Sequence, residues 1–438
     1  MMNELNPADL ELNKSTLQVS IENAKAVILG IHSHDINVAK VYSFILNCIE
    51  LIYAELIKEL SLSSEKDRFM NVERKLNNVL FEAHKRGIRI DSKKVRGYIE
   101  HLNFEIYKIK NRLQLEFGIF SLHDYDNIYL KVQNEFPIFK DIIVDTRDFW
   151  DAVKLQADNS ELLSLLYLQK KLTKNKDILA RIGSLDTEYI KPYFNYFGTV
   201  TGRILVNSPA LQQTNRKYRD IIIPNADMEL IYVDYTQFEA GILASEANEI
   251  KLIQMYNDKD IYIEISNKLG SDIVSRELAK KMFFCYCYGM SKENIRMYTG
   301  KNIDLFFGEF PDLETFEAHV GEQFLNSGYV ETSSGNRRYK SLNNVNNQKE
   351  GWLISQRIQG LASLIIKEVI LDIFTNQKDI EFLLPMHDAI LYRVPKDKVD
   401  ELTRCIEDAY MSILKKYCPS LNPKVLKKAF FEEEHIGL

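Results

Sequence analysis

The chain has 438 residues, of which 45% are hydrophobic and 27% charged, and its formal net charge is −6. This size and composition predict a globular protein of roughly two or three domains with ample apolar residues for a core. Five scattered cysteines without a C-x-x-C pair argue against a zinc site or a disulfide framework and fit a reducing cytosol. The acidic balance gives no global sign of a polyanionic partner, although a local basic surface is compatible with it.

The first strongly apolar stretch is VYSFILNCIELIYAELI from Val41, and no signal-peptide pattern precedes it. Asn47, Glu50 and Glu55 interrupt this stretch, so it is too polar for a membrane span. Its apolar residues recur at helical spacing, which predicts an amphipathic packing helix. We therefore expect a cytoplasmic protein without a membrane partner.

Most of the chain up to about residue 200 has helical periodicity. RKLNNVLFEAHKRGIRID predicts a helix that ends near Gly87, followed by a short extended piece with Asp91. LLSLLYLQKKLTKNKDILARI predicts another helix, with a basic stripe that fits either a solvated face or a nucleic-acid contact: Lys170, Lys171, Lys174 and Lys176.

Strand-like runs come late in the chain, as DIIIP, ELIYVDY and IEFLLPMHDAILYRVP, and helical patterns fill residues 240–326. The predicted class is α+β, mostly helical, with one small sheet.

Two acids stand at the ends of predicted strands. Asp234 ends an apolar run, and Asp388 lies at the turn of a predicted hairpin between two apolar runs. Burying an acid there is costly unless it is paired, hydrogen-bonded or bound to metal, although a helix N-cap would also explain Asp234. If both strands share one sheet, the two carboxylates converge. Such a pair suits magnesium that also holds substrate phosphates, as in two-metal phosphoryl transfer.

A second pattern lies in RELAKKMFFCYCYGMS, where two cations and two aromatic residues recur at steps of four: Arg276, Lys280, Phe284 and Tyr288. Each step of four advances about 40° beyond a full helical turn, so these side chains share one gently spiralling face. That face suits a polyphosphate with a planar ring stacked beside it. A chance arrangement on a helix surface is the alternative.

From about residue 70 to the end, the chain resembles the family-A DNA polymerases, the class that includes bacterial DNA polymerase I. VERKLNNVLFEAHKRGIRID is similar to the start of the family's thumb, and TVTGRILVNSPALQQT is similar to its T-G-R-L…P-N-L-Q block. YRDIIIPN followed by VDYTQFEAGILA resembles motif A, RELAKKMFFCYCYGMS motif B, and MHDAIL motif C. GYVETSSGNRRY and RIQGLASLIIKEVI match two further blocks, so seven blocks occur in the family's order.

The resemblance implies a right-hand architecture with an antiparallel palm sheet, helical fingers and a helical thumb. The expected divisions are an N-terminal helical region of unknown role (1–70), the thumb (71–198), the first part of the palm with motif A (199–250), the fingers with motif B (251–345), and the second part of the palm with motif C (346–438).

The resemblance also implies roles for matching residues. Asp234 and Asp388 would hold two Mg²⁺ ions, with Mn²⁺ as an alternative, and both acids would be catalytic. Arg276 and Lys280 would grip the triphosphate, and Lys280 would also protonate the leaving pyrophosphate.

Further roles concern the nucleotide and the nucleic acid. Phe284 would stack near the incoming base and sugar, and Tyr288 would line the templating pair. Glu239, five residues after Asp234, would pack near Tyr288 and exclude a ribose 2′-hydroxyl; a surface helix acid is the alternative. Contacts to the primer–template are expected from Arg203, Gln359, His387, Arg337 and Arg338.

The implied function is a template-directed DNA polymerase that adds deoxynucleotides to a primer 3′-hydroxyl, with primer–template DNA and deoxynucleoside triphosphates as its partners. We expect no proofreading, because residues 1–70 show no acidic exonuclease pattern. The alternatives are a polymerase that copies RNA or incorporates ribonucleotides, and a non-catalytic nucleic-acid-binding derivative. The sequence leaves the biological setting open, whether DNA replication, DNA repair, mobile-element replication or defence.

Five positions depart from the family pattern. Ala389 replaces the second acid of motif C, which predicts reduced activity. The others predict altered fidelity, because they adjoin the nascent base pair: Gly241 for an arginine, Phe283 and Cys285 for Asn and Gly, and Ser355 for an Asn.

Overall fold

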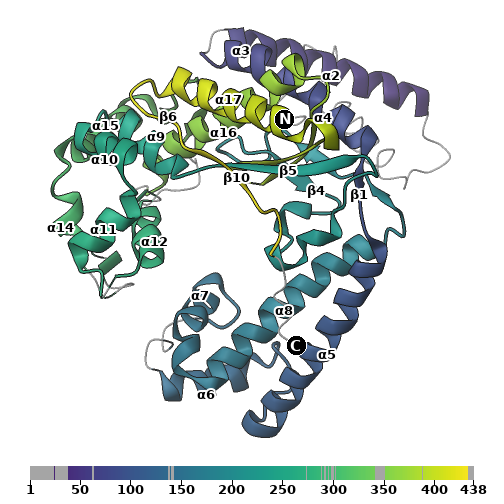
Figure 1. The fold of residues 1–438 in the computed structure, drawn as a ribbon, viewed down its shortest axis with the longest axis vertical. Helices are drawn as coiled ribbons and strands as arrows, with labels where there is room; N and C mark the ends of the chain where they lie inside the picture. The colour runs from purple at the N-terminus through teal and green to yellow at the C-terminus, as the bar shows by residue number, and fades with distance from the viewer. Residues whose placement is uncertain are drawn as a thin grey trace.

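The structure is a computed structural model of the 438-residue chain. It describes residues 24, 38–61, 64–136, 139, 143–272, 274–287, 289–290, 293, 295–296, 300, 302–340, 351–386 and 388–432. Figure 1 shows a body built on a sheet, with one helical lobe to its left and a second helical lobe below it.

A four-stranded antiparallel sheet forms the centre of the body, with the strand order β10–β5–β9–β8. Its strands are β5 (Met228–Tyr235), β8 (Glu381–Met386), β9 (Ala389–Pro395) and β10 (Val425–Lys428). Along β5, Ile231, Val233 and Tyr235 are buried while the residues between them are partly exposed, as expected for a sheet with one covered face. The strands predicted from ELIYVDY and IEFLLPMHDAILYRVP are confirmed.

Four helices pack around this sheet: α4 (Arg74–Arg86), α9 (Phe238–Glu246), α16 (Trp352–Asn376) and α17 (Val399–Tyr417). Figure 1 shows α16 and α17 along one side of the sheet. Helix α16 is buried on almost every side, which explains its nearly continuous apolar sequence. The opposite side of the sheet lies toward the space between the two lobes (Figure 1). Asp234 lies on that side, because side chains alternate along β5 and its neighbours Val233 and Tyr235 are buried on the covered side.

The left lobe contains α10 (Ile250–Asp258), α11 (Ile261–Leu269), α12 (Arg276–Cys287), α14 (Asp304–Phe307) and α15 (Pro311–Ser327). Its interior contains packed aromatic rings. For example, Tyr286 stacks on Phe307 with ring centroids 4.0 Å apart. An antiparallel ribbon of β6 (Tyr329–Glu331) and β7 (Arg337–Tyr339) leads back toward α16. The helices predicted between residues 240 and 326 are confirmed.

The lower lobe contains α5 (Ser92–Phe117), α6 (Tyr125–Glu135), α7 (Arg147–Gln156) and α8 (Glu161–Gly183). Asp91 caps α5 by accepting hydrogen bonds from the backbone N–H groups of Lys93 and Lys94 at 3.0 and 3.1 Å. The lobe has its own hydrophobic core around Phe149 and Trp150. Within the basic stripe of α8, the Lys170 ammonium lies 3.6 Å from the centre of the Trp150 ring, so this lysine takes part in packing.

Short ribbons join the lower lobe to the body: β1 (Ile88–Arg89) with β2 (Tyr189–Ile190), and β3 (Tyr193–Asn195) with β4 (Leu205–Asn207). Among the described residues, short 3₁₀ segments span Ala157–Asn159, Leu211–Gln213, Arg216–Ile221 and Lys396–Lys398. The extended piece predicted after Gly87 is confirmed as β1. The other ribbon strands and β10 were not predicted, so the prediction of one sheet was incomplete.

The strand predicted for DIIIP is wrong. Arg216–Ile221 forms a 3₁₀ helix, and the following Ile222 makes only an isolated bridge to Ile90. Asn215 starts the 3₁₀ turn by accepting a hydrogen bond from Lys217 N at 3.1 Å. Pro224 then offers no N–H group to a ladder, so the pairing of Ile222 and Ile223 with residues 89–91 stops at a single bridge.

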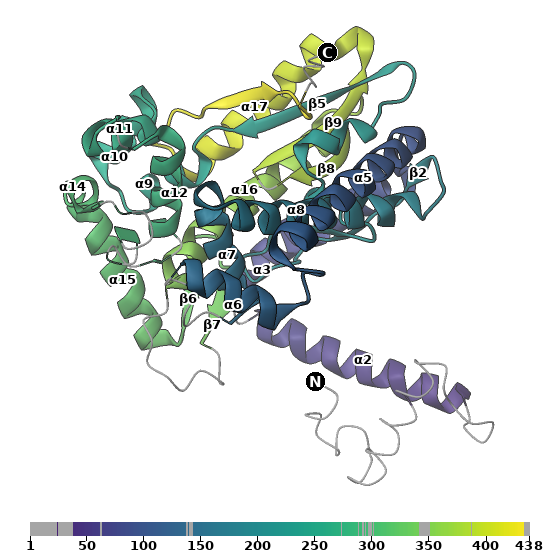
Figure 2. The ribbon, with the colours of Figure 1, turned by 90° about the horizontal axis from the view of Figure 1, so that it is seen from below.

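The described part of the N-terminal region comprises α2 (Val38–Ser61), α3 (Glu65–Arg68) and a π-helical turn (Phe69–Glu73) that runs into α4. Figure 2 shows α2 projecting away from the rest of the molecule. The predicted helix is confirmed, although Tyr42, Leu46 and Tyr53 are more than half exposed. Among the described residues, no helix is both long and apolar enough to span a membrane.

Candidate active site

The two predicted acids meet at one end of the central strands. Asp234 is the penultimate residue of β5 and lies opposite Ala389, the first residue of β9. Asp388 directly precedes Ala389, in the tight turn across which Met386 pairs with Ala389. Neighbouring strands lie about 4.7–4.9 Å apart, so this register brings both carboxylates to one place. The two strands therefore adjoin as predicted.

Asp234 does not cap a helix. It pairs within β5 on both sides, with Ala389 of β9 and Leu426 of β10. Helix α9 begins after Gln237, whose backbone has φ 55° and whose side chain makes no capping hydrogen bond. The N-cap alternative for Asp234 is thus wrong.

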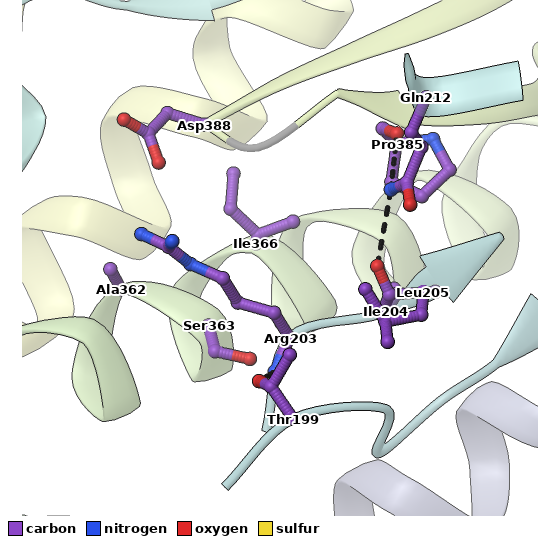
Figure 3. A pocket seen from close by; sticks show the side chains of 10 residues that line it. All are labelled: Thr199, Arg203, Ile204, Leu205, Gln212, Ala362, Ser363, Ile366, Pro385 and Asp388. Carbon is purple, nitrogen blue, oxygen red and sulfur yellow. Dashed lines mark hydrogen bonds between the residues drawn. The ribbon is translucent and has the colours of Figure 1, made fainter. Parts of the chain in front are cut away.

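Asp388 lies in an unfavourable electrostatic environment. Burial raises the pKa of Asp388 to about 7, and the negative charges of Glu239 and Asp234 add to the effect, while Arg203 and Lys280 oppose it. Asp388 lines a cavity of about 160 Å³ together with Arg203. Figure 3 shows the Arg203 guanidinium extending toward the side of the cavity on which the Asp388 carboxylate lies. Acids and cations thus gather at one end of the sheet, around Asp388.

Glu239 is a buried acid. It lies in the first turn of α9, its side chain is only 2% exposed, and it forms an ion pair with Arg203. The alternative of a surface helix acid is therefore wrong. Tyr288, the expected neighbour of Glu239, lies outside the described residues, so the predicted contact between them stays a prediction. The pair between Glu239 and Arg203 could not be predicted from the sequence, because the two residues lie on different elements.

A tight loop positions Arg203. The Gly198 N–H donates to Arg203 O at 3.0 Å, and the Arg203 N–H donates to the Thr199 hydroxyl at 3.0 Å. Gly202 has φ 79°, and a Cβ there would lie 3.1 Å from the Phe197 ring, so the loop requires glycine at this point.

Gln212 fixes the following segment to the sheet. Its amide donates to Pro385 O of β8 at 2.7 Å and to Ile204 O at 3.1 Å, and it accepts from Val206 N at 2.9 Å. Figure 3 shows Gln212 between these elements. Sequence reasoning missed this residue as a positioning group, although it lies in the LQQ part of a quoted block.

Helix α12 places Lys280 near Asp388. Lys280 is near enough for its positive charge to lower the pKa of Asp388, and its ammonium lies 5.9 Å from the centre of the Phe284 ring. Arg276, at the start of α12, donates to the Asp260 carboxylate at 2.7 and 3.2 Å. Phe284 is partly exposed, with its ring 6.2 Å from that of Tyr262. Arg276, Lys280 and Phe284 are each partly exposed, as their predicted common face requires.

The other predicted nucleic-acid contacts lie on β7 and α16 or outside the described residues. Arg337, on β7, donates to Glu331 at 2.7 Å and to the Ser64 hydroxyl at 3.0 Å, while Arg338 lies 3.9 Å from the centre of the Trp352 ring. Gln359 is partly exposed on α16. His387 lies outside the described residues.

Three of the departures from the family pattern have structural reasons. A Cβ on Gly241 would lie 2.7 Å from the Tyr256 ring, so Tyr256 occupies the space that a larger side chain needs. Ala389 is buried and pairs with Asp234, so an acid there would add a third charge beside the pair. Phe283 is fully buried in the lobe core and therefore serves packing.

The donor set fits a metal only in part. Among the residues that the structure describes, no group of three or more His, Cys, Asp or Glu side chains could enclose a metal ion. Asp234 and Asp388 alone offer carboxylate oxygens at neighbouring strand ends. Magnesium commonly binds one or two carboxylates and completes its shell with water and substrate phosphates. The residues therefore fit Mg²⁺ that arrives with a phosphorylated ligand.

Comparison with known proteins agrees with this geometry. Residues 68–420 match the family model of DNA polymerase family A. DNA polymerase I of Bacillus caldotenax is 26% identical over 385 residues, which cover 79% of this chain and 44% of that protein. The thermostable DNA polymerase I of Thermus filiformis is 25% identical over 381 residues, covering 78% of this chain and 45% of that protein. The chain thus spans less than half the length of these two relatives.

A solved structure has the same fold. The polymerase domain of Pol1 from M. smegmatis, in complex with a DNA primer-template and dNTP, superimposes with a TM-score of 0.76 at 20% identity, covering 89% of this chain and 75% of that chain. The right-hand architecture predicted from the sequence is therefore confirmed. Because the family match spans both strands that carry the acids, the helix that carries Lys280 and most of the rest of the chain, this protein belongs to DNA polymerase family A.

Proposed function

We propose that the chain is a template-directed DNA polymerase that adds deoxynucleotides to a primer 3′-hydroxyl. The observation that carries the proposal is the meeting of Asp234 and Asp388 at neighbouring strand ends, with Lys280 close enough to act on the charge of Asp388. The M. smegmatis Pol1 domain was solved with a DNA primer-template and dNTP, which supports the same two classes of ligand here.

The proposed division follows the right-hand plan. The palm would be residues 199–250 and 346–438, which include the central sheet, and the fingers would be residues 251–345, which include α12. The thumb would be residues 71–198, of which α5 to α8 form the separate lobe, while α4 packs into the main core. Residues 1–70 would have a role that we leave open.

The proposed reaction is nucleotidyl transfer. The primer 3′-oxygen would bond to the α-phosphorus, the bond from that phosphorus to the bridging oxygen would break, and pyrophosphate would leave, while the hydroxyl proton passes to solvent. Two Mg²⁺ ions, or Mn²⁺, held by Asp234 and Asp388 would neutralise charge and activate the 3′-hydroxyl.

Helix α12 would hold the triphosphate. Lys280 would pair with a phosphate oxygen and provide a proton to the leaving pyrophosphate. Arg276 would exchange Asp260, its present partner at 2.7 Å, for another phosphate oxygen. Phe284 would pack near the incoming base, with Tyr288 beside the templating pair.

Contacts to the nucleic acid and the sugar complete the proposal. Gln359, His387, Arg337 and Arg338 would touch the primer–template, whereas Arg203 would act first through its ion pair with Glu239. Glu239 would fill the space beside the deoxyribose. Since residues 1–70 have no acidic exonuclease pattern, we expect no 3′–5′ excision by this chain.

The acids provide the first test. D234A and D388A are each expected to lower primer extension to background, because each removes a carboxylate that the metal requires. Duplex binding, measured by fluorescence anisotropy, should stay within about two-fold of wild type, since phosphate contacts dominate affinity. D126A, which changes an exposed acid on α6, is the matched control and should extend normally. Substantial extension by D234A or D388A would refute the assignment.

The same assay separates the alternatives when it is run on DNA and RNA templates with both sugar types. We expect DNA-templated incorporation of deoxynucleotides to predominate and a mismatched primer end to remain uncut. Efficient copying of RNA would favour a reverse-transcribing enzyme, and preferred incorporation of ribonucleotides an RNA-synthesising one. Duplex binding without any extension would favour a non-catalytic derivative.

A further inference from the structure

An edge strand brings an unexpected cation to the acids. Strand β10 pairs with β5 so that Leu426 faces Asp234 and Lys428 faces Tyr232. Side chains alternate across a sheet, so Lys428 lies on the same face as Asp234, and Lys427 lies on the opposite face. The Lys428 ammonium donates to Asp234 Oδ2 at 2.7 Å, with the two side chains 38% and 21% exposed.

This contact completes a balance of charge at the site. The Asp234 carboxylate is neutralised by Lys428, and the buried Glu239 carboxylate is neutralised by Arg203. The negative charge of Asp388 is stabilised by the nearby positive charge of Lys280. Because Ala389 adds no further acid beside Asp234, three carboxylates face three cations and the site has no surplus negative charge.

A cation on a metal-ligand oxygen competes with the metal. The ammonium occupies one carboxylate oxygen of Asp234, and it repels a divalent ion at the other oxygen over a few ångströms. Lys428 also has room to move away from Asp234, because it borders a cavity of about 590 Å³ lined by Tyr232, Lys427 and Phe430. The pair is therefore an exchangeable counter-charge and not a buried structural bridge.

We propose that Lys428 is the counter-cation of Asp234 and weakens the hold of the site on a free divalent ion, so that the ion enters together with the triphosphate. The proposal rests on the proposed function, because the metal in question is that of the polymerase site. The negative charge of the triphosphate supplies the attraction that the balanced protein site lacks. It also gives the displaced ammonium a phosphate oxygen to approach.

The test measures binding of Mn²⁺ alone to the full chain by electron paramagnetic resonance. K428M is expected to bind Mn²⁺ about three- to thirty-fold more tightly than wild type, because a nearby positive charge is removed in a partly solvated site. K427M is the matched control, because Lys427 also borders this cavity but lies on the face of the sheet opposite Asp234. The K427M variant should bind Mn²⁺ as wild type does. A non-hydrolysable deoxynucleoside triphosphate should tighten wild-type binding more than it tightens binding to K428M.

A double-mutant cycle gives the decisive comparison. In a D234N background the K428M substitution should change Mn²⁺ affinity by less than about two-fold, because the partner of the lysine is gone. Unchanged or weaker Mn²⁺ binding by K428M in the wild-type background would overturn the proposal. Weaker duplex binding by K428M with unchanged Mn²⁺ affinity would also overturn it, because Lys428 would then be a DNA contact.

Failure of the proposed function gives a different result. A wild-type chain that shows the Mn²⁺ cycle but extends no primer would refute polymerase activity and support the role of Lys428. A chain that extends primers but shows no effect of K428M on Mn²⁺ binding would refute only the role of Lys428.

Discussion

At the scale of single residues, the three acids of the site differ because their surroundings differ. Asp234 is partly exposed and paired with Lys428, while Glu239 is 2% exposed and paired with Arg203. For Asp388, burial and the neighbouring acids raise its pKa to about 7. The same chemical group is therefore partly exposed and paired in Asp234, buried and paired in Glu239, and buried with a raised pKa in Asp388.

Glu239 gives the prediction at this scale. E239A is expected to raise the kcat/KM for a ribonucleotide relative to a deoxynucleotide by about ten- to a hundred-fold. The reason is that a 2′-hydroxyl would crowd the buried carboxylate and weaken its ion pair with Arg203, and alanine removes this obstacle. The measurement is single-nucleotide incorporation of both sugar types by wild type and variant.

E239Q is the matched control for this experiment. It leaves Arg203 without its charged partner, as E239A does, but it keeps the volume of the side chain. Retained sugar discrimination in E239Q and lost discrimination in E239A would establish that filled space excludes the hydroxyl. An unchanged ratio in E239A would show that Glu239 is not the gate.

At the scale of elements, a buried ion pair joins the N-terminal segment to the core helix of the body. The Lys367 ammonium of α16 donates to both oxygens of Glu73 at 2.8 and 2.7 Å, and both side chains are nearly inaccessible. Arg68 donates to the same carboxylate at 2.8 Å. Burial lowers the pKa of Lys367 to about 8, against the opposing effect of Glu73. Glu73 is therefore shared by two cations from different elements, of which Arg68 has Glu65 as a second partner at 3.0 Å.

This asymmetry predicts unequal costs of substitution. E73Q is expected to lower the free energy of unfolding by about 3–5 kcal/mol, because it leaves buried positive charge uncompensated. K367M should cost clearly less, because Glu73 keeps Arg68 as a partner. Urea unfolding monitored by circular dichroism measures both. E82Q, which breaks the exposed pair with Lys85, is the control and should cost less than about 1 kcal/mol. Equal losses in E73Q and K367M would contradict the prediction.

At the scale of the whole molecule, buried tyrosines hold the body together around the sheet. Tyr235 of β5 donates to the backbone of Tyr410 of α17 at 2.7 Å, and the two rings lie 4.7 Å apart. Tyr256 of α10 fills the space beside Gly241. Burial raises the pKa of each of these tyrosines, and it raises that of Tyr256 to about 12. Folding thus favours their neutral forms.

The consequence is a loss of stability in alkali. An unfolded tyrosine ionises near pH 10, whereas Tyr256 in the folded chain stays neutral to about pH 12. The contribution of neutral Tyr256 to the free energy of unfolding is therefore fully present below pH 10 and is lost as the pH rises toward 12. We expect Y256F to lose less stability than wild type between pH 8 and pH 11.5, by about 1–2 kcal/mol. Unfolding midpoints across this range provide the measurement. Parallel pH profiles for both proteins would contradict the prediction.

Local sequence patterns determined much of the fold. Alternating burial in β5, the helical face of α12 and the hairpin turn before Ala389 follow from periodicity and turn chemistry, so they could be predicted from a short window. The acids at strand ends were recognisable because an isolated buried acid is costly, which makes Asp234 and Asp388 stand out in apolar surroundings. The order of the blocks added the family resemblance, and the match over residues 68–420 confirms it.

The tertiary structure decided the partners of these residues. Arg203 and Glu239 are 36 positions apart, and Lys428 and Asp234 are 194 apart, so only the packing of the loop and the register of β10 bring them together. The same holds for DIIIP, whose β-branched residues favour an extended strand but pair with residues 89–91 at one bridge only. Propensity and periodicity act over a few residues, whereas charge compensation and strand pairing act across the folded chain. The sequence by itself therefore singled out Asp234 and Asp388 as candidates, and only the fold decided which cations lie beside them.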